Sequence, residues 1–288
     1  CFYIIKRWKV FFVEKGDLNI RTSEQHSYDN AIIGDGAGNN GRAKRENYRY
    51  KNYTAQQLLN WGKSFGLHNV DVLIGHEHYY YNYNYLYGYK SNQTFAGETE
   101  LVNFSEITSL TDYQHNYRTE SFLSRARYNY DQKYFIDGSF RRDGTSRFKN
   151  RWGNFWALGG SWIISEEDFF APLEDKVDYL KARVSYGEVG NDASADYYAQ
   201  YDLYLIRQNA NTAALTKSQY GNPDLIWETT SSMNAGLEGR LFDRANFTVE
   251  YFDKRSQNLL FDLNLPLSAG GTSTSSAEAV ITNNIGSI

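Results

Sequence analysis

Apolar and polar side chains alternate with a period of two along much of this chain. Such alternation is typical of β-strands whose two faces meet different environments. It predicts strands over residues 18–28, 47–61, 69–89, 121–130, 134–142, 154–164, 180–186, 227–237 and around 247–254. We therefore expect an all-β protein.

Each predicted strand has one apolar face and one polar or charged face. In the strand over 121–130, Phe122, Ala126 and Tyr128 share one face, whereas Arg125 and Arg127 share the other. A wall that separates lipid from water needs this division between its two sides. The charged residues that we expect on the inner, water-facing side are Arg125, Arg127, Arg141, Lys181, Arg183, Glu228 and Glu250.

The connections between the predicted strands alternate in length. Short polar turns lie near 62–68, 131–133 and 243–245, whereas longer segments cover 30–46, 91–112, 142–153 and 190–226. An up-and-down transmembrane barrel has short turns at one end and long loops at the other. The segment 165–178 is longer than its place on the short side predicts, and its Ser165 and Asp168 resemble a capping box, which favours a helical turn.

The composition fits strands with a membrane-facing side. Of the 288 residues 17% are aromatic, and 25 of them are tyrosines. Tyrosine and tryptophan favour the membrane interface, and outer-membrane barrels carry aromatic girdles at both rims. The run over 79–89 is predicted to form part of one rim. No stretch reaches the roughly 18 apolar residues that a transmembrane helix needs.

Charge and cysteine content exclude several classes of protein. The formal net charge is −4, so no broad electrostatic attraction to a phosphate backbone exists, and we expect no nucleic-acid partner. Cys1 is the single cysteine, which rules out an intramolecular disulfide and a cysteine cluster for zinc or iron–sulfur.

Two groups of residues could bind a metal or act on a sugar. His76 and His78 share one face of a predicted strand, but no third ligand is evident. Glu166, Glu167 and Asp168 are consecutive, so they are poorly placed to face each other across a glycosidic bond, and a solvated turn is favoured. We expect no metal site, no cofactor and no enzymatic activity.

The glycines of the segment GAGNNG match the spacing of a dinucleotide-binding loop. Gly36, Gly38 and Gly41 have this spacing, but the fingerprint requires a strand before it and a helix after it. The following residues, RAKRENYRY, are strand-like and basic, which favours a flexible loop.

A soluble protein could also produce the period-two pattern. A β-sandwich with an aromatic ligand surface alternates in the same way. The alternative function is therefore a soluble, β-rich carbohydrate-binding or adhesion module.

Long segments resemble the SusC/RagA group of TonB-dependent outer-membrane transporters, in that family's order. The similar segments are NVDVLIGHE (69–77), ESFLSRARYNYDQKYFIDGSFRRDGTSRF (120–148), WGNFWALGGSWIISEEDF (152–169), LKARVSYGEVGND (180–192), GNPDLIWETTSSMNAGLE (221–238) and LFDRANFTVEYFDKRSQNLLFDLNLP (241–266). They cover most of 45–288.

The resemblance implies a middle portion of a plugged transmembrane β-barrel of about 22 antiparallel strands. Residues 16–288 would supply an open, curved antiparallel sheet of roughly ten of these strands. The plug and the closing C-terminal strands would lie outside this chain. Residues 1–15 depart from the family's pattern, as a wrong reading frame or a truncated gene model would produce.

The resemblance also implies active import of a bulky nutrient, an oligosaccharide or a peptide, across the bacterial outer membrane. A SusD-like lipoprotein would cap the barrel, outer-membrane lipid would surround it, and the TonB–ExbB–ExbD complex would supply energy through the plug. Aromatic rings stack on sugars, so four loop tyrosines are the candidates for solute contact. They are Tyr197, Tyr198, Tyr201 and Tyr204.

Overall fold

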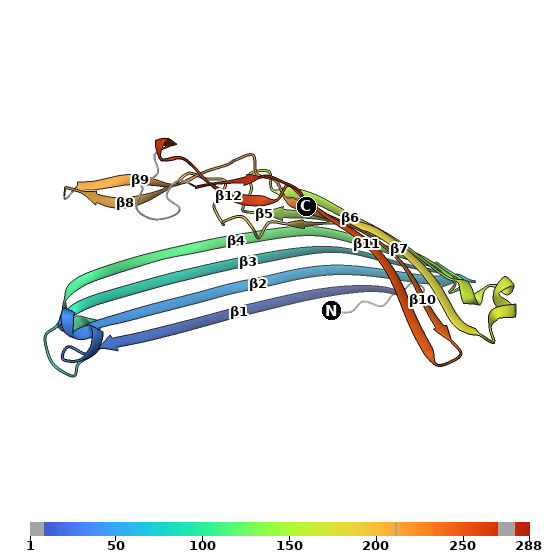
Figure 1. Cartoon of the computed structure of the whole chain (residues 1–288), viewed down its shortest axis with the longest axis horizontal. Helices are drawn as coiled ribbons and strands as arrows, with labels where there is room; N and C mark the ends of the chain where they lie inside the picture. Colours follow the sequence, from blue (N-terminus) through green and yellow to red (C-terminus); the bar gives the residue numbers. More distant parts are fainter. Residues whose placement is uncertain (1–8, 211, 270–279) are drawn as a thin grey trace. The chain divides into compact units, whose positions relative to one another are not determined.

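Nine strands form one antiparallel sheet that is not closed (Figure 1), in the order β1-β2-β3-β4-β5-β6-β7-β10-β11. The computed structural model describes residues 9–210, 212–269 and 280–288. The strands are β1 (Lys9–Asp29), β2 (Arg42–Phe65), β3 (His68–Gln93), β4 (Phe104–Tyr130), β5 (Tyr134–Thr145), β6 (Trp152–Ile163), β7 (Val177–Asn191), β10 (Glu228–Leu241) and β11 (Ala245–Gln257). The expected open antiparallel sheet is confirmed.

The segment set apart at the N-terminus is described only in part. Strand β1 begins at Lys9, so residues 9–15 belong to the sheet, and residues 1–8 lie outside the described residues.

A second, four-stranded sheet lies in segments that the alternation pattern did not mark as strands. Its order is β12-β13-β9-β8. Its strands are β8 (Leu203–Asn209), β9 (Thr212–Tyr220), β12 (Leu260–Asn264) and β13 (Val280–Asn284). The prediction that 190–226 is a loop throughout was therefore wrong. β12 and β13 have five residues each, too few for a period of two to stand out.

Strands β2, β3 and β4 are much longer than a bilayer requires. They contain 24, 26 and 27 residues, whereas a tilted strand crosses the hydrocarbon with about 9–11. Residues 104–112 were predicted as loop but belong to β4. Their segment FSEITSLTD is mostly polar and exposed, so no apolar face identifies it as a strand.

The short turns are confirmed, and their backbone conformations explain their sequences. Gly66, between β2 and β3, has a φ of +60°, which favours glycine. Asp131 and Gln132, in the three-residue connection between β4 and β5, both have positive φ (51° and 55°), and the Lys133 N–H donates to the Tyr130 carbonyl at 3.0 Å, which closes a tight turn.

The longer connection between β6 and β7 contains two 3₁₀-helices, η3 (Ile164–Glu166) and η4 (Asp168–Leu173). The predicted helical turn is present. The predicted capping box is not, because neither helix has a side-chain cap and the residues at the N-cap positions are Ile163 and Glu167. The glycine-rich segment forms a further 3₁₀-helix, η1 (Gly34–Asn39), between β1 and β2. Strand β2 follows it, and not the helix that a dinucleotide-binding fingerprint requires.

The strand register places the predicted apolar residues together on one face from β4 to β11. One cross-strand row contains Tyr128, Ile136, Gly160, Val184, Ala235 and Tyr251. Ile136, Leu158 and Val184 of this face are 55%, 56% and 52% exposed. The apolar rows are therefore an outer surface rather than part of a buried interior.

Aromatic rows border this apolar face at two levels. Tyr130, Tyr134 and Trp162 stack in succession, with ring centroids 6.3 and 6.2 Å apart. At the other level Phe122 lies 6.1 Å from Trp152. About nine residues of β4 separate Phe122 from Tyr130, the length of one bilayer crossing. These residues border the apolar face of the first unit, and a rim over 79–89 stays a prediction.

The buried hydrophobic cluster lies away from this face. It comprises Phe148, Ala195, Ala199, Leu225 and Leu260, with Trp227 packed against it. These residues come from the connections and from β12, so the cluster anchors the long connections.

The chain divides into two compact units. The first unit contains Cys1–Lys15, Gln56–His78 and Thr119–Ile288, and the second contains Gly16–Ala55 and Tyr79–Arg118. Among the described residues, no helix has the length and apolar character to cross a membrane.

Candidate functional site

The strand register places all seven predicted charged residues on the face of the sheet opposite the apolar rows. In the backbone register, Arg127 lies opposite Asp137, and Arg183 lies opposite Ser161 on one side and Gly236 on the other. Gly236 in turn lies opposite Glu250. Arg125, Arg141, Lys181 and Glu228 occupy positions of the same alternation in their strands. We call this surface of the first unit the polar face.

Arg183 is the centre of one charge network on the polar face. Its Nε donates to Glu238 Oε1 at 2.7 Å, and its Nη2 donates to Glu250 Oε1 at 2.8 Å. Gly236 lies beneath it, where an added Cβ would come within 3.0 Å of Arg183 Nε. One guanidinium therefore joins β7, β10 and β11.

A second network surrounds Arg141. Its Nε donates to Asp143 Oδ1 at 2.6 Å, and its Nη2 donates to Glu77 Oε1 at 3.2 Å and to Ser121 Oγ at 3.0 Å. Glu77 also accepts from the Gln56 side chain. The sequence pattern did not single out Glu77 or Glu238, although their places in alternating strands are consistent with the polar face.

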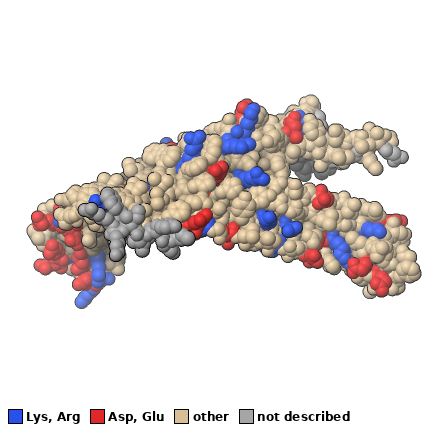
Figure 2. Space-filling view, turned by 180° about the vertical axis from the view of Figure 1, so that it is seen from behind, with Lys and Arg blue, Asp and Glu red and all other residues tan. Residues whose placement is uncertain are grey.

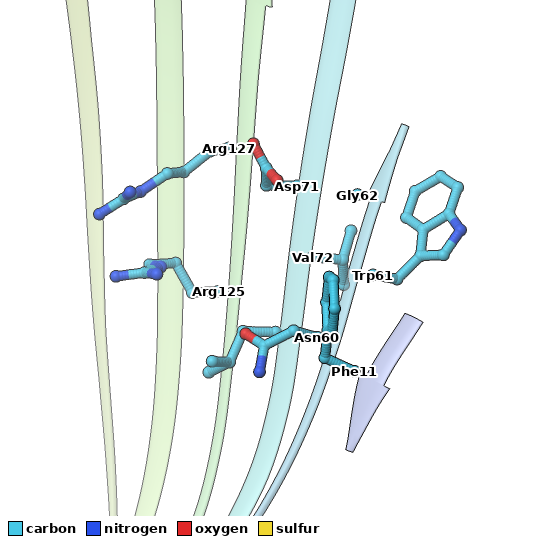
Figure 3. A pocket seen from close by; sticks show the side chains of 9 residues that line it. Phe11, Asn60, Trp61, Gly62, Asp71, Val72, Arg125 and Arg127 are labelled. Carbon is cyan, nitrogen blue, oxygen red and sulfur yellow. The ribbon is translucent and has the colours of Figure 1, made fainter. Parts of the chain in front are cut away.

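Arg125 and Arg127 differ from these paired arginines. They line a pocket of about 240 Å³ with Asn60, Gly62 and Asp71. Figure 3 shows both arginines extending to the same side, with Trp61 pointing away from them. Within residues 9–210, 212–269 and 280–288, neither arginine forms an ion pair.

The other predicted charged residues are also placed. Lys181 lines a pocket of about 480 Å³ that includes Asp71, Arg127 and Asp137. Among the described residues Lys181 forms no ion pair. Glu228 lies at the start of β10, where it accepts from Asn191 Nδ2 at 3.4 Å.

The four predicted loop tyrosines do not share one environment. The Arg147 guanidinium lies over the Tyr197 ring, with Cζ 4.9 Å from the ring centroid. The next residue, Tyr198, is partly buried. Tyr201 and Tyr204 are each 54% exposed. The structure therefore leaves Tyr201 and Tyr204 far more accessible to a solute.

Tyr204 lies in β8 of the second sheet rather than in a loop, and Lys217 of β9 lies opposite it. Its ammonium lies 2.9 Å from Asp202 Oδ2 and 5.9 Å from the centroid of the Tyr204 ring. The hydrogen bond with Asp202 raises the pKa of Lys217, and the Gly221 N–H together with Lys217 lowers the pKa of Asp202. The pair stays charged over the physiological range.

His76 is engaged by protein groups. Its Nδ1 lies 2.8 Å from Gln57 Oε1, and its Nε2 lies 3.1 Å from Glu120 Oε1. In the described parts of the chain, no three His, Cys, Asp or Glu residues are grouped so that they could hold a metal ion. Glu120 and His76 are the first polar pair beyond the aromatic rim at Phe122, whose ring lies 5.0 Å from His76.

Glu167 fixes the connection between β6 and β7 to the aromatic rim. Its carboxylate accepts from the Tyr134 hydroxyl and, at 2.9 Å, from Trp162 Nε1. These hydrogen bonds lower the pKa of Glu167. This member of the acidic run is thus a structural anchor.

A cluster of aromatic side chains in the second unit was not anticipated. Tyr48 and Tyr50 of β2, Tyr83 and Tyr85 of β3, and Tyr113 of β4 contact one another. The signal was present in the segment YYYNYNYLYGY, where tyrosine and asparagine alternate with a period of two.

Surface charge gives no continuous basic patch on the face drawn in Figure 2. There, basic side chains lie apart from one another or beside acidic ones, with uncharged surface between them. This distribution does not favour a polyanionic partner.

Comparison with known proteins identifies the family to which this sheet belongs. The family model described as "TonB dependent receptor-like, beta-barrel" matches residues 7–288. The chain belongs to this TonB-dependent receptor β-barrel family. It is therefore part of a bacterial outer-membrane protein.

Several relatives of this β-barrel family are similar in sequence. "TonB-dependent receptor P39" of Formosa agariphila is 33% identical over 243 residues, which is 80% of this chain and 22% of the relative. "TonB-dependent receptor SusC" of Bacteroides thetaiotaomicron is 28% identical over 251 residues, 84% of this chain and 24% of the relative. The chain thus spans about a quarter of the length of these relatives, and the predicted SusC/RagA resemblance is confirmed.

A solved structure of the same barrel type has the same fold. The "RagAB peptide transporter" superimposes with a TM-score of 0.85 at 23% identity, covering 96% of this chain and 31% of that chain. The soluble sandwich is excluded, because its core would bury the apolar rows that are exposed in this barrel wall.

Proposed function

We propose that the complete protein actively imports a bulky nutrient across the outer membrane, and that this chain supplies barrel wall and extracellular connections. The observation that carries the proposal is the two-faced sheet of the first unit. Exposed apolar rows between two aromatic levels suit lipid, and a face with charge networks suits a water-filled lumen. Residues outside this chain would supply the plug, the remaining strands and the contact with the TonB–ExbB–ExbD complex.

The solute class and the partner follow from the relatives. One solved neighbour is titled a peptide transporter, and one curated relative is named SusC. The proposed solute is accordingly an oligosaccharide or a peptide, and the proposed partner is a SusD-like surface lipoprotein. Such a solute is too large for passive diffusion pores, which fits an energy-coupled barrel.

The cations of the polar face that form no ion pair among the described residues suggest which residues contact the plug and which contact the solute. Arg183 and Arg141 are satisfied within the wall, whereas Arg125, Arg127 and Lys181 offer charge to a group outside this chain. We assign these three residues to contact with the plug, and Tyr201 and Tyr204 to contact with the solute.

An uptake experiment tests the import function. A strain lacking the complete gene is compared with the same strain carrying the gene, using fluorescent oligosaccharides and peptides as probes. We expect accumulation only with the gene, and its loss when a protonophore removes the energy for TonB. Equal accumulation in both strains, or accumulation that the protonophore leaves unchanged, would contradict active import.

A further inference from the structure

The strands of the second unit carry a surface of contacting tyrosine rings on one face. We name it the tyrosine platform, and it consists of Tyr48, Tyr50, Tyr83, Tyr85 and Tyr113 with His115. Its members occupy alternate positions, so their side chains lie on one face of β2, β3 and β4.

Ring contacts join the platform across three strands. The Tyr83 centroid lies 4.9 Å from Tyr50, 6.0 Å from Tyr113 and 6.0 Å from the nearly parallel His115 ring. The Tyr85 centroid lies 5.0 Å from Tyr48 and 5.1 Å from Tyr113. The rings therefore form one continuous aromatic surface.

The platform rings are not a buried core. Tyr113 is 42% exposed, and the other tyrosines of the platform are only partly buried. A core that only stabilised these strands would bury its rings and leave them with little contact to water. Half-exposed tyrosine combines an apolar ring with a hydroxyl that can hydrogen-bond, which is typical of ligand surfaces.

The opposite face of the same strands has a different composition. There Asn116 Oδ1 accepts from the Tyr80 hydroxyl at 3.0 Å and from Asn82 Nδ2 at 2.9 Å, and Asn84 donates to Asn82 at 2.6 Å. Amides that satisfy one another build a water-facing surface. The opposite face thus combines these amides with the ring pair of Tyr53 and Tyr80, whereas five contacting tyrosines lie on the platform face.

Charged side chains at the edges of the platform are already engaged with its rings. The Arg21 guanidinium lies 4.5 Å from the Tyr50 centroid, and the Glu46 carboxylate accepts from the Tyr48 hydroxyl. That hydrogen bond raises the pKa of Tyr48, and burial raises the pKa of Tyr83, so the phenols stay neutral hydrogen-bond donors. The surface offered to a ligand is aromatic and uncharged at its centre.

We propose that the tyrosine platform binds a neutral oligosaccharide segment of the imported solute, an assignment that rests on the import function proposed above. A sugar ring presents polarised C–H bonds on its apolar face, which the negative face of an aromatic ring attracts. Its hydroxyl groups reach outward to the phenols. A peptide would instead bring charged termini and unpaired amides that this surface does not satisfy.

Binding to the complete purified transporter in detergent tests the assignment. Isothermal titration uses neutral hexasaccharides of glucose, mannose, xylose and N-acetylglucosamine, with hexagalacturonate and a tryptic casein digest as the other arms. We expect at least one neutral hexasaccharide to bind. We also expect about tenfold weaker binding in the Tyr83→Ala/Tyr113→Ala variant, the effect of losing stacked rings.

Two matched variants separate stacking from folding. Tyr83→Phe keeps the ring and should bind within about twofold of the parent, because the stacking face is unchanged. Tyr53→Ala/Tyr80→Ala removes two contacting rings from the opposite face, 5.3 Å apart, and should bind as the parent does. Heat-dependent mobility in gels reports folding, and Tyr113→Ala alone replaces the double variant if that variant does not fold.

Three results would overturn the assignment. They are no binding of any neutral hexasaccharide, unchanged binding in the platform variants, and binding of only the anionic sugar or the peptides. Energy-dependent uptake of peptides together with any of these results would leave the import function standing. Absence of gene-dependent uptake for every probe would instead remove the import function itself.

Discussion

The two units use the same long strands for different surfaces. In the first unit, one face is apolar between aromatic rows, and the other holds the Arg141 and Arg183 networks. In the second unit, one face carries hydrogen-bonded amides beside the ring pair of Tyr53 and Tyr80, and the other is the tyrosine platform. Beyond the aromatic level at Phe122, the apolar face of the first unit gives way to the polar pair His76 and Glu120, where we expect the membrane-facing portion of these strands to end. The difference teaches that strand length alone does not report the membrane span.

The largest effect should come from a charge placed within the apolar rows. Val184→Arg puts a guanidinium where the wall faces lipid, and we expect a loss of about 2–4 kcal/mol of folding free energy. Urea titration in phospholipid vesicles, followed by tryptophan fluorescence, measures it.

Two controls localise this effect to the lipid-facing surface. Ser185→Arg, one residue further on the polar face, and Asn84→Arg, on the amide face of the second unit, should each change stability by no more than about 0.5 kcal/mol. An equal loss in all three variants would break the distinction between the units.

A close approach between β6 and β7, at Gly190 and Phe155, should give the next largest loss of folding free energy. An added Cβ at Gly190 would lie 2.0 Å from Phe155 Cζ, and Phe155 is only 5% exposed. Gly190→Ala therefore overpacks this site, with an expected loss of about 1–3 kcal/mol.

Gly138→Ala provides the control for this overpacking. Its added Cβ would meet Leu158 Cδ1 at an ordinary 3.7 Å, so the same titration should show no comparable loss. A stable Gly190→Ala variant would mean that the Phe155 ring can move freely.

Replacing a paired arginine should cost more folding free energy than replacing an unpaired one, by a smaller margin than in the preceding variants. Arg183→Met leaves Glu238 and Glu250 without their shared partner, and we expect a small loss of folding free energy at this partly exposed network. Arg125→Met removes no ion pair from the wall. Its effect on the wall should be smaller, and a larger loss than in Arg183→Met would contradict the division of the polar face.

The smallest expected effect is a pH dependence of stability at the connection between β6 and β7. Hydrogen bonds from Tyr134 and Trp162 lower the pKa of Glu167, so its contribution is present above the ordinary glutamate pKa of about 4.3 and is lost as pH falls through the lowered value. Glu167→Gln should flatten this acid-side decline in stability. Parallel pH titrations of parent and variant that superimpose would show that Glu167 is not coupled to the rim.

Much of the first unit could be predicted from its sequence. The alternation in 121–130 and its successors gave the strands, and Val184, Ile136 and Ala235 fall in one row as their patterns require. Asp131 and Gln132 marked the turn correctly. Strong alternation determines which side of a strand is apolar, and a slip by one residue would reverse every side chain.

The second unit and the second sheet were harder to predict for physical reasons. Residues 104–112 are strand without an apolar face, and β12 and β13 are too short to show a period. The tyrosines of 79–89 looked like a membrane rim because ring chemistry suits both an interface and a ligand surface. Partners of the charged residues, such as Glu77 for Arg141, depend on register between distant strands.

Spin labels in the complete transporter, reconstituted in vesicles, test the central claim most directly. Labels at Leu158, Ser185 and Asn84 are compared for collision with oxygen, which enriches in lipid, and with a water-soluble nickel chelate. We predict that oxygen dominates at Leu158 and that the chelate dominates at Ser185 and Asn84. Chelate access at Leu158, or oxygen dominance at Asn84, would contradict the two-faced wall and its end at His76 and Glu120.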